Sequence, residues 1–473
     1  MKNSEELRQQ LRSINRKSYP AYKGLKGLYH FGNYILSIDH VQGDPFASPS
    51  HVSIQISHRD AGFPDEYYKD TLTKTTLCDY LTRQFEKQVS QYSFRAKGSG
   101  KSGLLTVSHC GQEVLSRTAC EITEKGITAR FFVGFPANGR TINATELEKI
   151  LFDFLPVCIQ KSFFYSSLNA KELQNYIELA EDQEFIRQML PAKNLCAFIA
   201  DGSILPRESG ISSRPMKASV PFTSPDSLHI SINLPHKGKI TGMGIPKGIT
   251  LIVGGGYHGK STLLNALELG VYNHIPGDGR EYVITDATAV KLRSEDGRFI
   301  KDVDISMFIN DLPNKKDTRC FSTLDASGST SQAAGIVESI EAGSHLFLLD
   351  EDTSATNFMV RDAFMQQVIQ REKEPITPFL ERAENLYKKA GISTILVAGS
   401  SGAFFHIADT IIQMDNYVPK NITASVKKLC SQYPLPAVSV TDFQLPHSHR
   451  IMSRPAGSSK RLRHNSRGNH SDS

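Results

Sequence analysis

Two stretches of the chain differ in how apolar and polar residues are spaced. From about Gly27 to Pro156, short runs of alternating apolar residues are separated by glycine, proline and asparagine. A period of two is typical of half-buried strands joined by turns. Within the same stretch, Asp70–Gln88 and Ala144–Phe154 show helical spacing, as does Glu5–Asn15 before it. The first third of the chain is therefore predicted to fold as a mixed α+β domain.

From Ile249 to about Met414 the pattern changes to continuous apolar runs that alternate with helical segments. The runs are ITLIV, EYVIT, HLFLLD, STILVAG and TIIQM, and the helical segments are STLLNALELG, SQAAGIVESIEAG and ENLYKKAG. Strands buried on both faces read as continuous apolar runs, and their alternation with helices is typical of a parallel sheet flanked by helices. We predict an α/β fold with a mostly parallel sheet for this part.

Between these parts, Ser167–Leu190 has helical spacing and is predicted to form a connecting helical pair. The chain thus divides into an N-terminal α+β module (1–160), a helical connector (161–205), an α/β core (206–425) and a C-terminal tail (426–473). Beyond Gln444 the tail has six lysines or arginines and a single acid, Asp472. It lacks the apolar residues to fold, so we expect a disordered segment, either a polyanion-binding arm or a solvated end.

Composition excludes several classes of protein. The 473 residues carry 54 lysines and arginines against 49 acids, a mild net charge of +5. No apolar run approaches the ~20 residues that a membrane-spanning helix needs, and the charged N-terminus has no apolar signal region. The seven cysteines are scattered singly, without zinc or disulfide spacing. We expect a cytoplasmic protein with reduced thiols.

The segment GGGYHGKST lies between an apolar run and a helical pattern and fits GxxxxGK[ST]. Its residues are Gly254, Gly255, Gly256, Tyr257, His258, Gly259, Lys260, Ser261 and Thr262. Glycines let backbone N–H groups curve around an anion, and a following helix adds positive potential at its N-terminus. Lys260 is predicted to contact the β- and γ-phosphates, and the Ser261 hydroxyl to bind Mg²⁺. This segment predicts an ATP site.

A second candidate group follows the apolar run HLFLLD. Asp350 ends this run and is placed to hold the Mg²⁺ shell, as in phosphate-loop nucleotide hydrolases. Glu351 follows directly and is predicted to orient the attacking water as a general base. Lys260 and Glu351 are thus the candidate catalytic residues.

The segment before this run resembles the signature LSGGQ of the ABC-type ATPases, which begins a helix. Ser327 and Gly328 match it, while Ser329 and Thr330 replace the second glycine and the glutamine. The separation between Ser327 and Asp350 is the one that the family shows. The run DEDTSATN after the acids is similar to the family run DEPTSALD. The resemblance implies that Ser327, Gly328 and Ser329 act on a nucleotide held by a partner subunit, and so an ATP-dependent homodimer.

Other positions depart from the ABC pattern. Where many members carry a switch histidine, this chain has Gly399. The alternatives for contacting the γ-phosphate are Ser400, Ser401 and His406. The glutamine-loop position corresponds to Asp286, and Phe222 is either an adenine-stacking residue or a core residue.

Longer literal runs resemble one family in particular, the predicted ABC-class ATPases, which include a trypanosome mitochondrial relative associated with RNA editing. These runs are DHVQGDPFASPS, GSGKSG, GFPANGR, GGGYHGKSTLL, HIPGDGREYVIT, EDGR (Glu295–Arg298), DASGSTSQAA and DEDTSATNFMVRD. The resemblance implies a soluble ATPase with an N-terminal module on an ABC-type nucleotide domain. It extends from about Tyr19 to Asn421.

The N-terminal module has a second glycine-rich segment, SFRAKGSGKSGLL. Arg95 stands where a phosphate loop needs glycine, so the segment is predicted to be a flexible cationic loop with Arg95, Lys97 and Lys101. Its amides and charges suit RNA or DNA phosphates. Arg130 and Arg140, together with Arg83 and Arg117, can extend this surface. The alternative is an ordinary solvated surface, or basic residues that contact ATP.

Two further alternatives remain at this point. Acids and a histidine in Asp39–Phe46 suggest either a metal site or a turn stabilised by aspartate side chains, of which the turn is favoured. The chain as a whole is predicted to be an ATPase coupled to nucleic-acid binding. Two alternatives remain. The first is a nucleic-acid-binding protein with ATP as a slow structural ligand, and the second, less favoured, is the ATPase subunit of a transporter.

Overall fold

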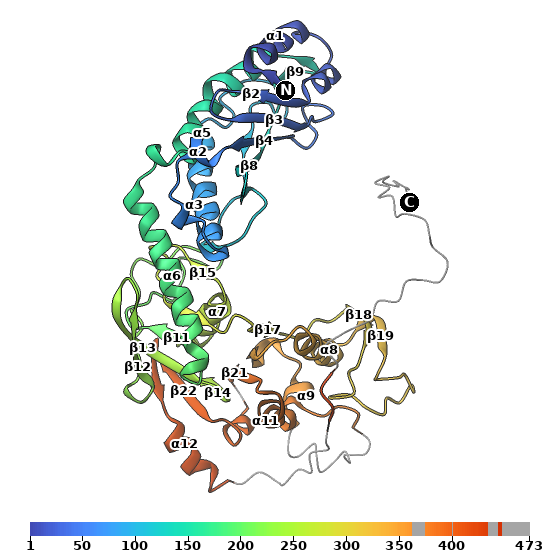
Figure 1. Ribbon diagram of the computed structural model, residues 1–473. Helices are drawn as coiled ribbons and strands as arrows, with labels where there is room; N and C mark the ends of the chain where they lie inside the picture. Colours follow the sequence, from blue (N-terminus) through green and yellow to red (C-terminus); the bar gives the residue numbers. More distant parts are fainter. Residues whose placement is uncertain (362–373, 400, 434–442, 447–473) are drawn as a thin grey trace.

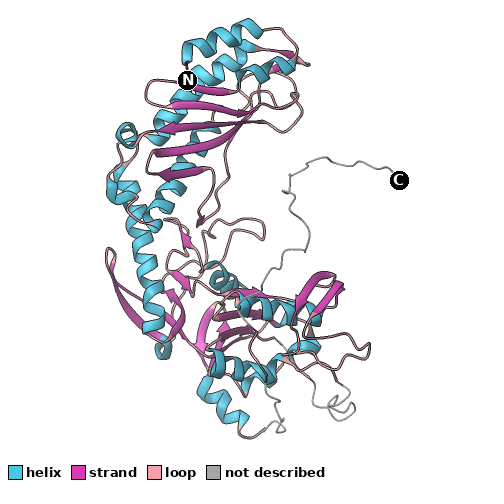
Figure 2. Ribbon diagram, turned by 45° about the vertical axis from the view of Figure 1, so that its right-hand side comes forward, coloured by secondary structure: helices cyan, strands magenta, loops and turns pink. Residues whose placement is uncertain are grey.

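The computed structural model describes residues 1–361, 374–399, 401–433 and 443–446, which together form a crescent (Figure 1). The N-terminal module forms one arm and the α/β core forms the other. The long helix α6 (Ala170–Ala192) connects the two arms along the outer side of the crescent, as Figure 2 also shows.

A seven-stranded sheet dominates the N-terminal module. Its order is β1-β2-β3-β4-β8-β5, with β7 also paired to β8. The strands are β1 (Lys2–Asn3), β2 (Gly27–His30), β3 (Ile35–His40), β4 (Ser50–Ile56), β5 (Leu105–Thr106), β7 (Cys120–Thr123) and β8 (Gly126–Val133), and β9 (Ala137–Asn138) and β10 (Thr141–Ile142) form a separate pair. The helices are α1 (Ser4–Ile14), α2 (His58–Ala61), α3 (Thr71–Val89), α4 (Ala144–Glu148) and α5 (Leu155–Phe163).

Helices α3 and α5 cover one face of this sheet. The Phe85 ring of α3 meets Phe131 of β8 and Phe163 of α5 at centroid distances of 5.1 Å each. Helix α3 begins where the sequence caps it, because the Asp70 carboxylate accepts the N–H of Thr73 at 2.8 Å. The opposite face of the sheet carries exposed side chains.

The α/β core is built on a six-stranded sheet in the order β17-β20-β21-β14-β22-β23. Its strands are β14 (Ile249–Val253), β17 (Val290–Leu292), β20 (Leu346–Asp350), β21 (Ser393–Val397), β22 (Thr410–Asp415) and β23 (Val418–Asn421). All neighbours pair in parallel except β22 with β23. Every residue of β14, β20 and β21 is buried, which explains their continuous apolar sequences.

A four-stranded antiparallel sheet lies beside this one, in the order β12-β13-β11-β16. Its strands are β11 (Leu195–Ala200), β12 (His229–Leu234), β13 (Gly238–Pro246) and β16 (Val283–Thr285). Two small pairs join β6 (Glu113–Val114) to β15 (Asn273–His274) and β18 (Arg298–Val303) to β19 (Phe321–Ala326). The core helices are α7 (Lys260–Leu269), α8 (Gly328–Glu341), α9 (Thr356–Met359), α11 (Phe379–Ala390) and α12 (Thr423–Cys430).

Short helical turns complete the described elements. They are η1 (Tyr19–Leu25), η2 (Asp65–Tyr67), η3 (Lys149–Phe154), η4 (Tyr165–Ser167), η5 (Asp226–Leu228), η6 (Glu351–Thr353) and η8 (Ala403–Phe405). Of these, η3 is π-helical and joins α4 to α5 without a break.

The predicted fold classes of both parts are found, and several details differ. The predicted helical pair over Ser167–Leu190 is the single helix α6, capped by Asn169, whose side chain accepts the N–H of Glu172. Strand β11 falls within the range predicted as a helical connector but belongs to the antiparallel sheet. Helix α12 extends to Cys430, so the first residues of the predicted tail are helical. Most of the tail lies outside the described residues.

Candidate nucleotide-binding site

The predicted phosphate loop joins the carboxyl end of β14 to the N-terminus of α7. The Nζ of Lys260 donates to the carbonyl oxygens of Gly254 at 2.6 Å and Gly255 at 2.9 Å. The ammonium group is thus folded back onto its own loop. Ser261 follows in the first turn of α7 and is exposed. An incoming phosphate would meet this ammonium group, the loop amides and the positive end of the helix together.

Two glycines of this loop adopt backbone conformations that other residues resist. Gly254 has φ +140°, and a Cβ there would lie 2.4 Å from a carbonyl oxygen of β22. Gly259 has φ +96°, and a Cβ there would lie 2.9 Å from the Tyr417 ring. The turn after β22 also holds the loop through the N–H of Asn416, which donates to Nδ1 of His258 at 2.9 Å. The loop is therefore shaped partly by a turn 158 residues further along the chain.

The acidic strand β20 reaches the same sheet edge as β14, with β21 between them. Asp350 pairs with Val397 of β21, and Val397 pairs with Ile252 of β14. Burial is the largest cause that raises the pKa of Asp350 above its ordinary value, while the charges of Lys291 and Lys260 act in the opposite direction. A buried carboxylate within the field of the loop lysine is suited to a cation, and its oxygens are of the type that Mg²⁺ prefers.

Glu351 is held by the loop that follows β21. Its Oε2 accepts the N–H of Gly399 at 2.7 Å and the N–H of Ser401 at 3.4 Å. Gly399 is the position at which the ABC pattern has a histidine. In the structure, Gly399 contacts the predicted general base Glu351 through its backbone N–H and not through a side chain. Of the other candidates, Ser400 lies outside the described residues, and the described contacts of His406 involve only its backbone.

The signature-like segment forms the N-terminus of α8, and Ser327 is the N-cap residue of this helix. The Ser327 hydroxyl lies 3.4 Å from that of Ser329 and 3.0 Å from that of Thr330. Gly328 is packed closely, because a Cβ there would lie 2.3 Å from the Ser294 hydroxyl. The helix end therefore presents small polar groups and its positive dipole together.

Buried Gln332 links this helix to the segment after the acids, a role that the sequence did not indicate. Its Nε2 donates to the Ser354 hydroxyl at 3.0 Å, and its Oε1 accepts the N–H of Ala355 at 3.0 Å. Ser354 in turn donates to the carbonyl oxygen of Asp350 at 2.8 Å. The signature helix is thus hydrogen-bonded to the segment that follows the acidic strand.

A cavity of about 1160 Å³ opens beside the phosphate loop. Gly259 and Thr262 line it from the loop and α7, and half-exposed Tyr417 lines it from the turn after β22. The segment from Leu205 to Phe222 closes the other side. Phe222 is only 2% exposed and packs in the core, so of the two alternatives the structure favours a core residue that lines the cavity wall. The wall residues are Glu113, Leu205, Pro206, Arg207, Ser209, Gly210, Ile211, Ser212, Ser213, Met216, Ala218, Ser219, Val220, Phe222, Gly259, Thr262, Asn265, Glu268, Leu269, Arg280, Met414 and Tyr417.

The other residue considered for nucleotide contact is Asp286, and its side chain forms hydrogen bonds within its own turn. Its Oδ1 accepts the N–H of Thr288 at 2.8 Å and the Thr288 hydroxyl at 2.7 Å. This is a turn in which an aspartate side chain bonds its own backbone two residues on.

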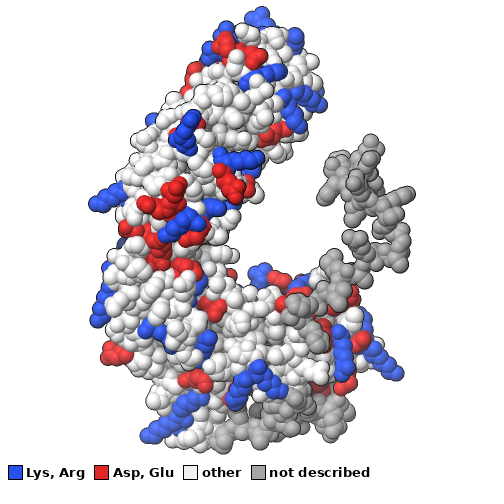
Figure 3. Space-filling model, in the orientation of Figure 1, with Lys and Arg blue, Asp and Glu red and all other residues white. Residues whose placement is uncertain are grey.

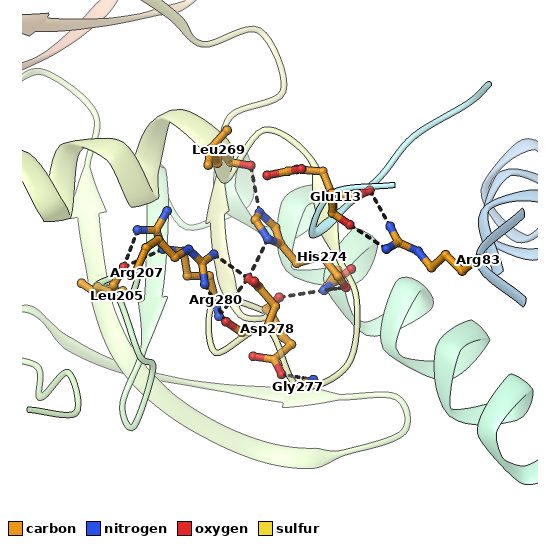
Figure 4. Close-up of polar contacts among 12 residues, drawn as sticks. Arg83, Glu113, Leu205, Arg207, Leu269, His274, Gly277, Asp278 and Arg280 are labelled. Atoms are coloured by element: carbon orange, nitrogen blue, oxygen red, sulfur yellow. Dashed lines mark hydrogen bonds and ion pairs between the residues drawn. The ribbon is translucent and has the colours of Figure 1, made fainter. Parts of the chain in front are cut away.

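A buried polar cluster at the far end of α7 joins the core to the N-terminal module (Figure 4). His274 of β15 lies between the helix end and Asp278: Nε2 is 3.1 Å from the Leu269 carbonyl oxygen, and Nδ1 is 2.8 Å from the Asp278 carboxylate. Arg207 also donates to that carboxylate at 2.9 Å. Burial lowers the pKa of Arg280 to about 10, with the charge of Arg207 as a further cause.

The N-terminal module reaches this cluster through strand β6. Asn273 and His274 of β15 pair with Val114 and Glu113 of β6. Arg83 of α3 donates to the carbonyl oxygen of Glu113 at 3.0 Å. The helix that follows the phosphate loop is thus connected to α3 by a continuous chain of hydrogen bonds.

The cationic segment of the N-terminal module is a tightly bonded turn, so its predicted flexibility is wrong. The N–H of Ser99 donates to Ala137, that of Lys101 to Pro45, and that of Gly103 to Gly134, over 2.7–2.9 Å. Gly134 has no room for a Cβ, which would lie 1.8 Å from the Lys101 carbonyl oxygen. The amides of Ser99, Lys101 and Gly103 are therefore not available to phosphates, and the basic side chains of the segment remain candidates.

Three of the motif runs noted in the sequence meet at this turn. They are the runs around Pro45, around Gly100 and around Ala137. The predicted aspartate turn is confirmed: the Asp44 carboxylate accepts the N–H groups of Phe46 at 2.8 Å and Ala47 at 3.1 Å. Among the described residues no group of His, Cys, Asp and Glu side chains is arranged to hold a metal.

The basic candidates of this module fall into two groups. Arg83 and Arg117 do not extend a groove, since both form buried ion pairs with Asp79. Arg95, Lys97, Arg130 and Arg140 are exposed, and Lys101 is half-buried. Arg130 pairs with Glu121 at 2.9 Å, and Arg95 lies over the Tyr92 ring at 4.9 Å. Figure 3 shows lysine and arginine side chains along the margin of this module next to the concave side.

Among the described residues, no helix combines the length and the apolarity needed to cross a membrane. All seven cysteines are free, and five of them are buried.

Comparisons with known proteins match both parts of the chain. A family model described as a P-loop domain matches residues 169–448, and one described as the N-terminal part of an ATPase of the ABC class matches residues 4–166. An uncharacterized protein of Methanocaldococcus jannaschii is 31% identical over 251 residues, which are 50% of this chain and 54% of that protein. The chain thus spans about half the length of the curated relative that it matches.

Solved structures are similar at lower identity. An ATP-binding cassette of an ABC transporter in its ADP conformation shares 13% identity over 41% of this chain and 88% of that chain, with a TM-score of 0.27. A component of an ABC transporter complex from Clostridium perfringens shares 14% over 41% and 86%, with a TM-score of 0.26. TM-scores this low do not establish the fold, which is assigned from the order of the strands in the sheet. Because the P-loop family model covers more than half of the residues and the N-terminal model covers most of the rest, this chain belongs to the ATPases of the ABC class.

Proposed function

We propose that the chain binds ATP with Mg²⁺ at the loop Gly254–Thr262 and hydrolyses it. The observation that carries this is the convergence of three groups at one edge of the parallel sheet. Lys260 follows β14, while Asp350 and Glu351 end β20, and β21 lies between the two strands. Ligands of α/β sheets bind at the carboxyl ends of the strands, which is where these groups meet.

The residues present suit a magnesium ion. Asp350 offers a carboxylate and Ser261 an exposed hydroxyl, both hard oxygen donors. When bound, Mg²⁺ would neutralise charge on the phosphate oxygens. Lys260 would exchange the carbonyl oxygens of its loop for phosphate oxygens. Glu351, held by the N–H groups of Gly399 and Ser401, would orient the attacking water.

The nucleoside of the ATP is assigned to the cavity beside the loop. Tyr417 lies against Gly259 and keeps half of its surface exposed. Its ring is placed to stack on the base, and no local pattern indicates it because it lies in a turn far along the chain from the loop.

Two copies of the chain are proposed to pair when ATP is bound. The N-terminus of α8 carries Ser327, Gly328 and Ser329, and none of the described contacts ties these residues to the phosphate loop of the same chain. A second copy would supply the missing half of the site. Gln332 would transmit closure to the acidic strand through Ser354 and Ala355.

Three variants test the ATPase proposal, with Lys239→Ala on the exposed surface of β13 as the control. We expect Lys260→Ala to abolish the heat of MgATP binding in calorimetry. We expect Glu351→Gln to bind ATP, to lose turnover and to elute as a dimer in gel filtration with ATP. Ser327→Arg should remain monomeric. Normal hydrolysis by Glu351→Gln would refute the role of the base, and tight binding by Lys260→Ala would refute the site.

The N-terminal module is proposed to bind nucleic acid and to be moved by the ATP cycle. The support is the set of exposed basic side chains, Arg95, Lys97, Arg130 and Arg140, with Lys101 beside them. The hydrogen-bonded path from α7 to α3 gives the two activities a physical connection. ATPase rates measured with and without RNA, single-stranded DNA and duplex DNA test this coupling.

A slow ATPase is the second candidate, and Gly399 favours it. Only the backbone of this residue reaches Glu351, and no imidazole stands at this position to contact the γ-phosphate. In that case ATP would act as a long-lived ligand of a nucleic-acid-binding protein. Single-turnover measurement of hydrolysis separates the two candidates.

A further inference from the structure

The open face of the N-terminal sheet carries a row of exposed rings, and of these His40 lies in a motif run noted in the sequence. His40, His51 and Phe132 are direct cross-strand neighbours on β3, β4 and β8. The ring centroids of His40 and His51 are 5.4 Å apart, and those of His51 and Phe132 are 5.1 Å apart. All three side chains are exposed, and Phe132 keeps 38% of its surface free. We call these three residues the ring row.

The ring row lies at one end of the sheet, next to the turn where three motif runs meet. His40 ends β3, His51 is the second residue of β4, and Phe132 precedes the last residue of β8. Their strands lead directly into the runs around Pro45 and Ala137. The glycines packed at that turn hold the surroundings of the row in a fixed shape.

Basic side chains flank the row. Arg130 lies two residues before Phe132 on the same strand, and Lys101 lies in the packed turn. The ion pair of Arg130 with Glu121 is exposed on both sides, so it is worth little and can be exchanged for a phosphate. The Phe46 ring, 61% exposed, lies against Gly100 in the same turn. Asp39, an acid beside the row, accepts the hydroxyls of Ser37 and Ser53.

We propose that the ring row binds single-stranded nucleic acid by stacking of its bases. Three adjacent strands span roughly 10 Å, which accommodates two or three stacked bases, as sheets that read single-stranded RNA do. A duplex keeps its bases paired and inaccessible to such rings, whereas its phosphates would still meet the lysines and arginines. The inference rests on the proposed nucleic-acid binding and states which form of nucleic acid the module takes.

The experiment compares a single-stranded oligonucleotide of about 12 nucleotides with the duplex of the same sequence, by fluorescence anisotropy on the full-length chain. We expect Phe132→Ala to weaken single-strand binding by about 5–100-fold and to leave any duplex binding within about twofold. His51→Ala should act in the same direction. Phe299→Ala is the matched control, because Phe299 is an exposed phenylalanine (56%) on β18 of the other arm.

Each outcome decides something different. Single-strand binding that Phe132→Ala and His51→Ala leave unchanged would overturn the ring row as the site. Binding of the duplex alone would overturn the single-strand inference and leave the proposed nucleic-acid function standing. Binding of neither probe by a folded, ATP-binding sample would refute both. Circular dichroism of each variant identifies any that fails to fold, and Phe132→Leu then replaces Phe132→Ala, since leucine fills space without stacking.

Discussion

The buried cluster at the end of α7 provides a prediction whose size follows from its geometry. Oδ2 of Asp278 accepts from Arg207 at 2.9 Å, from His274 at 2.8 Å and from the N–H of Arg280 at 3.3 Å. Oδ1 is buried and has no hydrogen-bond partner among the described residues. In Asp278→Asn the amide oxygen can take the place of Oδ2, so this variant removes the charge and keeps most of the hydrogen bonds.

The loss of charge leaves buried cations without a counter-ion. Removing one partner of a buried ion pair costs about 3–5 kcal/mol. For a cooperative unit the size of the α/β core, this lowers the melting temperature by roughly 6–20 °C. Scanning calorimetry of the full chain at pH 7 measures it, with Asp226→Asn, an exposed aspartate beside the antiparallel sheet, as the control. We expect that control to melt with the wild type.

The pH dependence supplies a second, independent check. Burial alone would raise the pKa of Asp278, but the hydrogen bonds from His274 and Arg207 outweigh it and hold the pKa below its ordinary value. Such a group stabilises the fold above its unfolded pKa of about 3.9, and the contribution is lost as the pH falls through the folded pKa. The gap between wild type and Asp278→Asn should therefore be constant near neutrality and should narrow below about pH 4. A gap of less than about 2 °C at pH 7 would refute the reasoning.

Three further predictions concern other parts of the molecule. Gln332→Ala leaves the N–H of Ala355 without its partner, so we expect kcat to fall about tenfold with little change in KM; steady-state kinetics measure both, and an equal rise in KM would contradict the link to the acidic strand. Gly259→Ala places a Cβ against a ring at φ +96°, which costs about 1–2 kcal/mol and should weaken ATP binding about 5–30-fold in calorimetry; unchanged affinity would show that the loop relaxes. The amides of Ser99, Lys101 and Gly103 should be protected in hydrogen exchange, and exchange at the rate of an open loop would contradict the packed turn.

The parts that sequence predicted well are those in which the signal is local. The loop Gly254–Thr262 can be predicted from sequence because strand, glycines, lysine and helix follow one another directly. The acids after β20 can be predicted because a buried strand must be apolar up to the point where it meets solvent. These local patterns predict the α/β class and the candidate residues Lys260, Asp350 and Glu351, whereas the common sheet edge follows from the strand order.

The parts that sequence missed depend on pairing between distant residues. The bond from Gly399 to Glu351 joins positions 48 residues apart. The ring row exists only because the register of three strands aligns one residue from each. The spacing of Arg83 and Arg117 predicts surface residues, but both pair with Asp79, which becomes buried only when α3 packs. Such contacts are set by tertiary packing, which local spacing does not reveal.

The pairing of β6 with β15 bears on how this chain can be divided in the laboratory. A fragment that contains only the α/β core would lose strand β6 and leave the backbone of Asn273 and His274 without its partner. Bare strand edges invite association with other chains. Truncated fragments are thus expected to precipitate or to self-associate during purification, and a usable core fragment would need residues 113–114 grafted back or the edge blocked by a charged substitution.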